Sequence, residues 1–156
     1  MSDQEVITHS PAETHRLAKR LLARLPPRAV LALHGDLGSG KTCFVQGLAK
    51  ALGIKQAVTS PTFALVHEYE GRRPLVHVDL YRIRSVADAE MMGLEEYFDA
   101  DGIVAIEWAE RTAALLPPHT IHIHFEALAA AGDRRITVAD FDPAAPGAAD
   151  PLTAPR

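Results

Sequence analysis

Hydrophobic residues along this chain gather in short runs that predict buried strands. Residues 29–33 and 103–106 are entirely apolar, a pattern typical of strands covered on both faces of a parallel sheet. Residues 75–78 form a third run, interrupted only by His77, and end at Asp79. These three segments predict the centre of a sheet.

Three further segments predict strands that are less deeply buried. Apolar residues at positions 121, 123 and 125 alternate with polar residues, which indicates a strand with one exposed face. Residues 64–69 precede a turn rich in Gly, Arg and Pro, and so predict a hairpin with 75–78. A last strand is expected at 135–139.

Segments whose apolar residues have helical spacing lie between these strands. Ser10, Pro11 and Glu13 form a capping box that opens a helix with a leucine stripe, and Pro26 and Pro27 end it. A second helix is predicted over 41–52, with Gly53 after its last turn. Shorter helical segments are expected at 85–93, 94–98 and 109–116.

The segment between strand 29–33 and helix 41–52 is rich in glycine. Residues 35–42 read GDLGSGKT and match the phosphate-binding pattern G-x-x-x-x-G-K-[ST] at every fixed position. Glycines let several backbone N–H groups converge on one phosphate, Lys41 adds a point charge, and Thr42 offers a hydroxyl to Mg²⁺. A glycine turn in some other α/β protein is the alternative interpretation.

The strand–loop–helix context favours the phosphate loop. It predicts an α/β fold, a three-layer domain like the P-loop NTPases with a mixed, partly parallel sheet. The chain has no asparagine, so the N-K-x-D guanine-recognition motif of GTPases is absent, and ATP is the expected nucleotide.

Composition sets the class of protein. The 156 residues, 47% hydrophobic and 23% charged, predict one globular domain over 1–141 and a disordered Pro/Ala-rich tail over 142–156. A net charge of -4 means that any RNA contact would have to be a local patch. With one cysteine, no signal-peptide pattern and no long apolar run, we expect a cytoplasmic protein without a membrane span.

Two acids follow apolar strands directly. Asp79 comes after 75–78 and Glu107 after 103–106, so both should lie at the carboxyl edge of the sheet beside residues 35–42. One is expected to be the Walker-B-type metal ligand, directly or through water. The other would complete the metal shell or orient the attacking water. Ordinary surface carboxylates are the alternative.

Several other side chains allow more than one interpretation. His77 is expected to be a partly buried, hydrogen-bonded residue, and His34 a packing residue at a strand end. His122 and His124 could form a metal pair, although a solvated strand face is the preferred interpretation. Trp108 fits equally well near the nucleotide or in the core.

Four segments together resemble the TsaE family: residues 35–42, Ser60-Pro61-Thr62-Phe63, His77-Val78-Asp79-Leu80-Tyr81-Arg82 and Ile106-Glu107-Trp108. The resemblance runs from about residue 10 to 138. It implies a small ATPase of bacterial tRNA threonylcarbamoyladenosine biosynthesis that binds ATP and Mg²⁺. It also implies action with the TsaB–TsaD complex, which modifies adenosine 37 of tRNAs reading codons that begin with A, so tRNA would be contacted indirectly.

The resemblance also implies roles for single residues. Lys41, Asp79 and Glu107 would be catalytic, and Thr42, Asp79 and Glu107 would serve the metal. The nucleotide would be bound by Leu37, Gly38, Ser39, Gly40, Lys41, Thr42 and, in a looser alignment, Arg134. Residues 59–62 match the family's switch-like loop. Cys43 departs from the family, which commonly has threonine there.

Two competing functions remain open. A small-molecule P-loop kinase would need an acceptor pocket and a lid with arginines, for which Arg82 and Arg84 are the available side chains. A non-hydrolysing protein would use bound ATP only to hold its shape. We expect slow hydrolysis by the protein alone, with a partner completing the site, because no arginine is placed as an obvious arginine finger.

Overall fold

The computed structural model describes residues 3–61 and 65–139. The strands in chain order are β1 (Gln4–Thr8), β2 (Arg28–His34), β3 (Val66–Tyr69), β4 (Leu75–Asp79), β5 (Gly102–Glu107), β6 (Ile121–Ala127) and β7 (Arg134–Ala139). The helices are α1 (Pro11–Leu22), α2 (Lys41–Ala51), α3 (Val86–Met91), α4 (Leu94–Phe98) and the 3₁₀ helix η1 (Ala109–Leu115).

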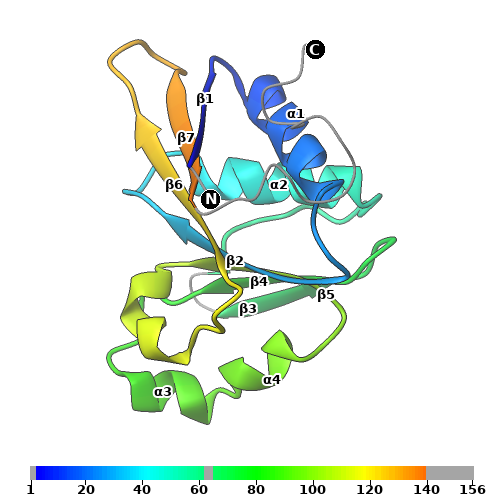
Figure 1. The fold of residues 1–156 in the computed structure, drawn as a ribbon, viewed down its shortest axis with the longest axis vertical. Helices are drawn as coiled ribbons and strands as arrows, with labels where there is room; N and C mark the ends of the chain where they lie inside the picture. Colours follow the sequence, from blue (N-terminus) through cyan, green and yellow to red (C-terminus); the bar gives the residue numbers. More distant parts are fainter. Residues whose placement is uncertain (1–2, 62–64, 140–156) are drawn as a thin grey trace.

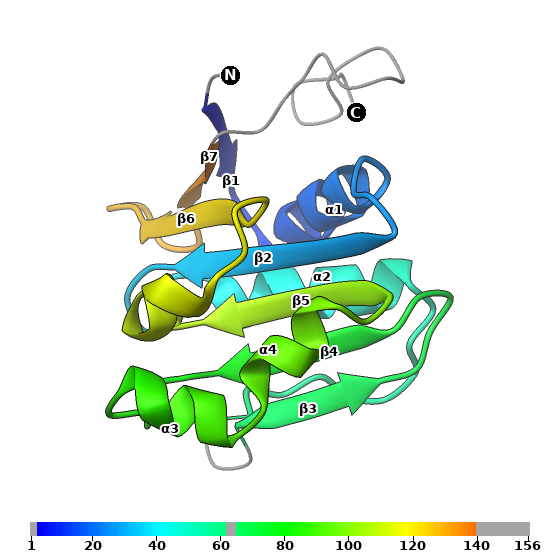
Figure 2. The same ribbon diagram turned by 60° about the horizontal axis from the view of Figure 1, so that its bottom comes forward.

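All seven strands form one mixed sheet in the order β1-β7-β6-β2-β5-β4-β3. Strand β2 pairs in parallel with β5 and β6, and β4 pairs in parallel with β5. Antiparallel pairs extend both edges, through β6, β7 and β1 on one side and through the β3–β4 hairpin on the other. Figure 2 shows β6, β2, β5 and β4 pointing the same way. The predicted mixed α/β fold is confirmed.

Helices cover both faces of the sheet, so the molecule has three layers (Figures 1 and 2). One core joins α1 and α2 to alternate residues of the strands, with Leu31 and Phe44 fully buried. The other joins α3, α4 and η1 to the remaining strand residues, with Ala32 and Ile106 fully buried. The central strands are thus apolar on both faces because both faces are packed.

The helix starts follow the local sequence. The Ser10 hydroxyl accepts a hydrogen bond from the Glu13 N–H at 3.2 Å, and Ser85 caps α3 in the same way. Helix α1 ends at Leu22, yet Leu25 remains buried. Helix α2 spans nearly the predicted segment, and Gly53 after it has a φ of 76°.

Three expectations about elements were wrong or incomplete. The sequence pattern predicts no element before residue 10, but Gln4–Thr8 forms β1 by pairing antiparallel with β7. Segment 109–116 is helical as expected, but it forms a 3₁₀ helix that is broken at Thr112. The predicted strand 64–69 begins at Val66, because Leu65 has a φ of 69°. Residues 62–64 and the predicted tail 142–156 lie outside the described residues.

Candidate functional site

Glycines shape the loop between β2 and α2. Gly35, Gly38 and Gly40 have φ angles of 147°, 77° and 112°. A Cβ on Gly35 would also lie 2.5 Å from the carbonyl oxygen of Phe125 on β6. Side chains are therefore excluded at Gly35 both by conformation and by space. The loop leads directly into the N-terminus of α2, which favours anions.

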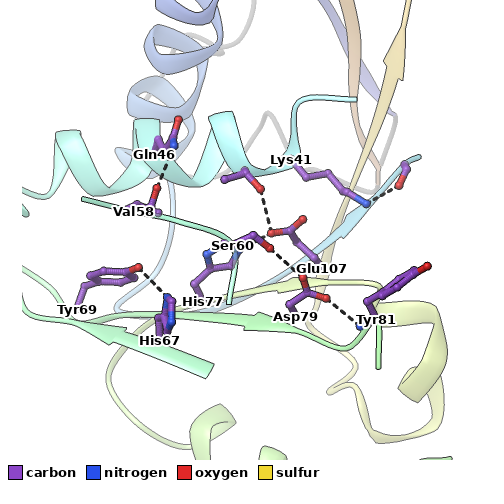
Figure 3. A network of polar contacts seen from close by, with 12 residues as sticks. Lys41, Gln46, Val58, Ser60, His67, Tyr69, His77, Asp79, Tyr81 and Glu107 are labelled. Atoms are coloured by element: carbon purple, nitrogen blue, oxygen red, sulfur yellow. Dashed lines mark hydrogen bonds and ion pairs between the residues drawn. The ribbon is translucent and has the colours of Figure 1, made fainter. Parts of the chain in front are cut away.

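Lys41 points back into this loop. Its side chain is buried, and its Nζ donates a hydrogen bond of 2.5 Å to the Gly35 carbonyl (Figure 3). The ammonium also lies 4.3 Å from the ring centroid of Trp108. A buried ammonium held by one carbonyl and one aromatic face is ready to bind a phosphate that enters the loop.

The predicted site residues surround one cleft of about 550 Å³. Its lining consists of Leu37, Gly38, Gly40, Lys41, Thr42, Cys43, Ser60, Asp79, Tyr81, Glu107, Trp108 and Arg134. The volume is in the range of small-molecule sites. Of the predicted nucleotide ligands, only Ser39 does not line the cleft.

Ser39 faces the other side of the loop. Its hydroxyl is buried without a hydrogen-bond partner, and it lines a neighbouring cavity of about 360 Å³ with Gly35 and residues of β6 and β7. A ligand in the main cleft could therefore contact the backbone of Ser39 but not its side chain.

The two predicted acids end neighbouring strands. Asp79 of β4 and Glu107 of β5 are register partners, and both are almost fully buried, at 3% and 4% exposed. Strand β5 also pairs with β2, which leads into the loop, so the acids and the loop meet at the same sheet edge.

Asp79 has hydrogen bonds on both carboxylate oxygens. Oδ1 accepts from the Tyr81 N–H at 2.8 Å, and Oδ2 accepts from the Ser60 hydroxyl at 2.9 Å (Figure 3). These bonds fix the carboxylate and connect it to the loop before β3. Because both oxygens are used, contact with a metal through a water molecule is easier than direct ligation.

Glu107 lies between Thr42 and a buried histidine. Its Oε2 is 3.4 Å from the Thr42 hydroxyl and 2.5 Å from His77 Nε2. His77 is fully buried, and its Nδ1 has no hydrogen-bond partner. The histidine, expected to be partly buried, therefore holds the carboxylate on which the predicted metal site depends.

The oxygen atoms of Thr42, Glu107 and Asp79 suit Mg²⁺, a hard cation that prefers few protein ligands and takes the rest from phosphate and water. The described residues contain no cluster of three or more His, Cys, Asp or Glu able to hold a metal ion.

Arg134 reaches the loop from β7. Its Nη2 donates to the Gly38 carbonyl at 3.2 Å, and its side chain would touch a Cβ on Gly40 at 3.7 Å. The loosely aligned arginine thus lies beside the predicted phosphate loop. Arg135, by contrast, forms ion pairs with Glu5 and Glu126.

The histidines of β2 and β6 form a stack. The His34 ring lies 5.1 Å from the His122 ring and 4.7 Å from the His124 ring, between centroids. His34 Nε2 is 2.9 Å from His122 Nδ1, and its Nδ1 is 3.4 Å from Glu110. Burial, followed by the charges of His124 and His122, lowers the pKa of His34, and Glu110 opposes this shift.

Trp108 lies both near the expected nucleotide site and against the core, the two positions considered for it. It lies against Lys41 in the cleft, and it also packs on the core beneath α3 and η1. Its φ is 60°, a strained conformation for a tryptophan, and it lies between the end of β5 and the start of η1. The Tyr81 ring packs on it, with centroids 5.1 Å apart.

Sequence reasoning assigned no role to Tyr81 or to the hydroxyl of Ser60. Tyr81 follows Asp79 by two residues, the spacing at which an aspartate accepts from a backbone N–H in an Asx turn. That spacing was a usable signal. The Ser60–Asp79 hydrogen bond joins a loop to the end of β4, and no sequence pattern indicated it.

Comparison with known proteins decides the family. A family model described as "Threonylcarbamoyl adenosine biosynthesis protein TsaE" matches residues 8–136. The chain belongs to the TsaE family. This membership confirms the resemblance inferred from the four sequence segments.

Curated relatives agree with this family. Proteins named tRNA threonylcarbamoyladenosine biosynthesis protein TsaE include one from Treponema pallidum that is 43% identical, over 85% of this chain and 98% of its own. One from Bacillus subtilis is 44% identical over 74% of this chain and 73% of its own. One from Aquifex aeolicus is 45% identical, over 69% and 78% of the two chains.

A solved structure has the same fold. The crystal structure of Bacillus subtilis YdiB superposes with a TM-score of 0.74 at 37% identity, covering 88% of this chain and 86% of that one. Among the described residues, no helix is long and apolar enough to cross a bilayer.

Proposed function

We propose that this protein is a Mg²⁺-dependent ATPase that acts with the TsaB–TsaD complex in forming threonylcarbamoyladenosine in tRNA. The observation that carries the proposal is the convergence of Lys41, Thr42, Asp79 and Glu107 on one cleft beside a glycine loop. The family name supports the pathway.

The chain's own groups have distinct tasks in this proposal. Backbone N–H groups of 38–42 and the start of α2 bind the β- and γ-phosphates, and Lys41 exchanges the Gly35 carbonyl for a phosphate oxygen. Bound Mg²⁺ would neutralise charge on the phosphates. Glu107 and Thr42 would hold that ion, and Asp79 would bind one of its waters.

The free protein is expected to hydrolyse ATP slowly. Lys41 is engaged by Gly35 and Trp108, and Ser60 is bonded to Asp79, so the cleft must rearrange before reaction. A partner that stabilises the rearranged loops would raise the rate by shifting this population. We therefore infer that the TsaB–TsaD pair activates hydrolysis.

The test measures release of inorganic phosphate from ATP and Mg²⁺, first with the protein alone and then with TsaB–TsaD. A slow basal rate that rises with the pair and disappears in Lys41→Ala supports the proposal. A hydrolysis rate that does not change when TsaB–TsaD is added would contradict the proposal that this pair is the partner. Phosphate transferred to a small acceptor, with none released, would instead favour a kinase.

Binding can be followed separately from hydrolysis. Trp108 is the only tryptophan, and Lys41 lies against its ring. Nucleotide binding should draw Lys41 away from the ring and change the fluorescence. Lys41→Ala should lose this response, whereas Glu107→Gln should keep it while losing hydrolysis. Loss of both signals in Glu107→Gln would contradict a purely metal-related role for Glu107.

A further inference from the structure

A third cavity lies on the helical face that carries α1 and α2, away from the nucleotide cleft. It is a groove of about 590 Å³ between the two helices, reached also by Arg72 from the β3–β4 turn. Its lining consists of Ala12, His15, Arg16, Lys19, Gly47, Lys50, Ala51 and Arg72. None of these residues lines the nucleotide cleft, which meets the N-terminal end of α2, whereas the groove meets its C-terminal half.

The groove is strongly basic in a protein that is acidic overall. Four of its eight lining residues are arginine or lysine, His15 is a fifth, titratable residue, and none is acidic, although the chain has a net charge of -4. Among the described residues, no carboxylate forms an ion pair with Arg16, Lys19 or Lys50. Their positive charges are therefore available to a ligand.

Two observations describe the surroundings of His15 and Arg72 in the groove. Burial, and then the charge of Lys50, lowers the pKa of His15. The Arg72 guanidinium donates to the Ala51 carbonyl at the end of α2, so it is anchored at the groove. Cations gathered without counter-charges mark an anion site, because an anion removes their mutual repulsion.

The remaining lining residues indicate which kind of anion fits. They are Ala12, Gly47 and Ala51, all small, and the groove has no aromatic or large aliphatic side chain. Protein–protein interfaces usually have large apolar or aromatic side chains at their centre, and the lining of this groove supplies none of them. A basic groove whose other lining residues are small suits a chain of phosphates better than a protein surface.

We propose that the α1–α2 groove binds the sugar–phosphate backbone of an RNA strand. The contacts are made by Arg16, Lys19 and Lys50, with Arg72 at one end. This is the local patch that an acidic protein would need in order to touch RNA. The family's place in tRNA modification is consistent with such a ligand. The proposal does not rest on ATP hydrolysis.

The test measures binding of a labelled tRNA transcript by fluorescence anisotropy without nucleotide, across a salt series. For about three neutralised phosphates, binding should weaken roughly 20-fold between about 50 and 200 mM salt. Lys19→Ala/Lys50→Ala should bind roughly tenfold more weakly and show a shallower salt dependence. Alanine preserves both helices, and a urea melt checks that the variant is folded.

A matched control removes two positive charges elsewhere. Arg28→Ala/Arg84→Ala should bind RNA like the wild type, because neither residue lines the groove. Equal weakening in both double variants, or no RNA binding by the wild type at low salt, would overturn the proposal. Unchanged RNA affinity with lost affinity for TsaB–TsaD would also overturn it and assign the groove to an acidic protein surface.

Nucleotide assays keep this proposal separate from the ATPase. The groove variant should retain the Trp108 fluorescence response and basal phosphate release. Lys41→Ala should lose both and still bind RNA. If Lys41→Ala loses RNA binding as well, the RNA contact lies at the nucleotide cleft and the groove proposal is wrong.

Discussion

At the scale of single residues, the most informative contact is the one between His77 and Glu107. A carboxylate that must serve a metal gains from being fixed before the ligand arrives, because less reorganisation is then needed. His77 is fully buried on β4, and its Nε2 lies 2.5 Å from Glu107 Oε2 on β5. We interpret His77 as a positioning residue that acts through Glu107.

A pair of amide substitutions tests this role. The side-chain nitrogen of Gln can take the place of His Nε2, whereas that of Asn falls short. His77→Asn should lower kcat for ATP hydrolysis by about 10–100-fold with little change in nucleotide affinity. His77→Gln should restore most of the rate. Equal losses in both variants, with equal melting temperatures, would contradict positioning through this nitrogen.

Residue types and their spacing predicted most of the candidate site. A glycine loop, Lys41 and Thr42 form a contiguous pattern, and Asp79 and Glu107 end strands whose order in a parallel sheet is restricted. The contacts that join distant segments were not predictable in the same way. His34 stacking on His122 and Ser60 bonding to Asp79 depend on the relative placement of loops and strands, which one sequence does not encode locally.

At the scale of elements, the packing of α1 on α2 depends on one glycine. A Cβ at Gly47 would lie 2.8 Å from His15 Cα and 2.9 Å from Ala18 Cβ, both on α1. Glycine inside a helix costs about 1 kcal/mol relative to alanine, so its presence in α2 needs a reason. The reason is the close approach of the two helices.

Gly47→Ala should therefore destabilise the protein in spite of its better helix propensity. The backbone of α1 must shift, and overpacking of this kind costs roughly 2 kcal/mol net. For a domain of this size, thermal melting should fall by about 4–8 °C. Gly53→Asn is the control, because nothing lies within 4 Å of its added Cβ and asparagine tolerates positive φ. A Gly47→Ala variant as stable as that control would refute the packing argument.

Elements with strong periodicity were predicted well, and those defined by pairing were not. The capping box and leucine stripe of α1 are local signals, and the structure follows them. Strand β1 has only five residues with weak alternation, and it exists because β7 supplies its hydrogen bonds. The break at Thr112 in η1 likewise has no local signal, because no proline or glycine lies within that helix.

At the scale of the whole molecule, two histidines link stability to pH. Burial is the main cause that lowers the pKa of both His15 and His34 in the folded protein from the ordinary 6.5. The unfolded chain then binds more protons than the folded one as pH drops below that value. The two histidines contribute fully to the free energy of unfolding above about pH 6.5. This contribution is lost as the pH falls through their folded-state pKa values.

Urea denaturation should show this dependence. The wild-type midpoint should fall between about pH 7.5 and 5.5, and His15→Gln/His34→Gln should fall less, because glutamine does not titrate. The difference between the two slopes is the relevant quantity, since carboxylates are common to both proteins. Parallel slopes would show that neither histidine is protonated on unfolding in this range.

The pairing of β1 with β7 also has a consequence for synthesis on the ribosome. The first strand of the sheet finds its only neighbour in the last described strand, so that edge cannot close until nearly the whole chain has emerged. Until then, β6 and the N-terminal segment present unpaired backbone groups, which invite association between nascent chains. A message truncated before codon 134 would thus encode an aggregation-prone fragment, even though it contains every residue of the glycine loop and both acids.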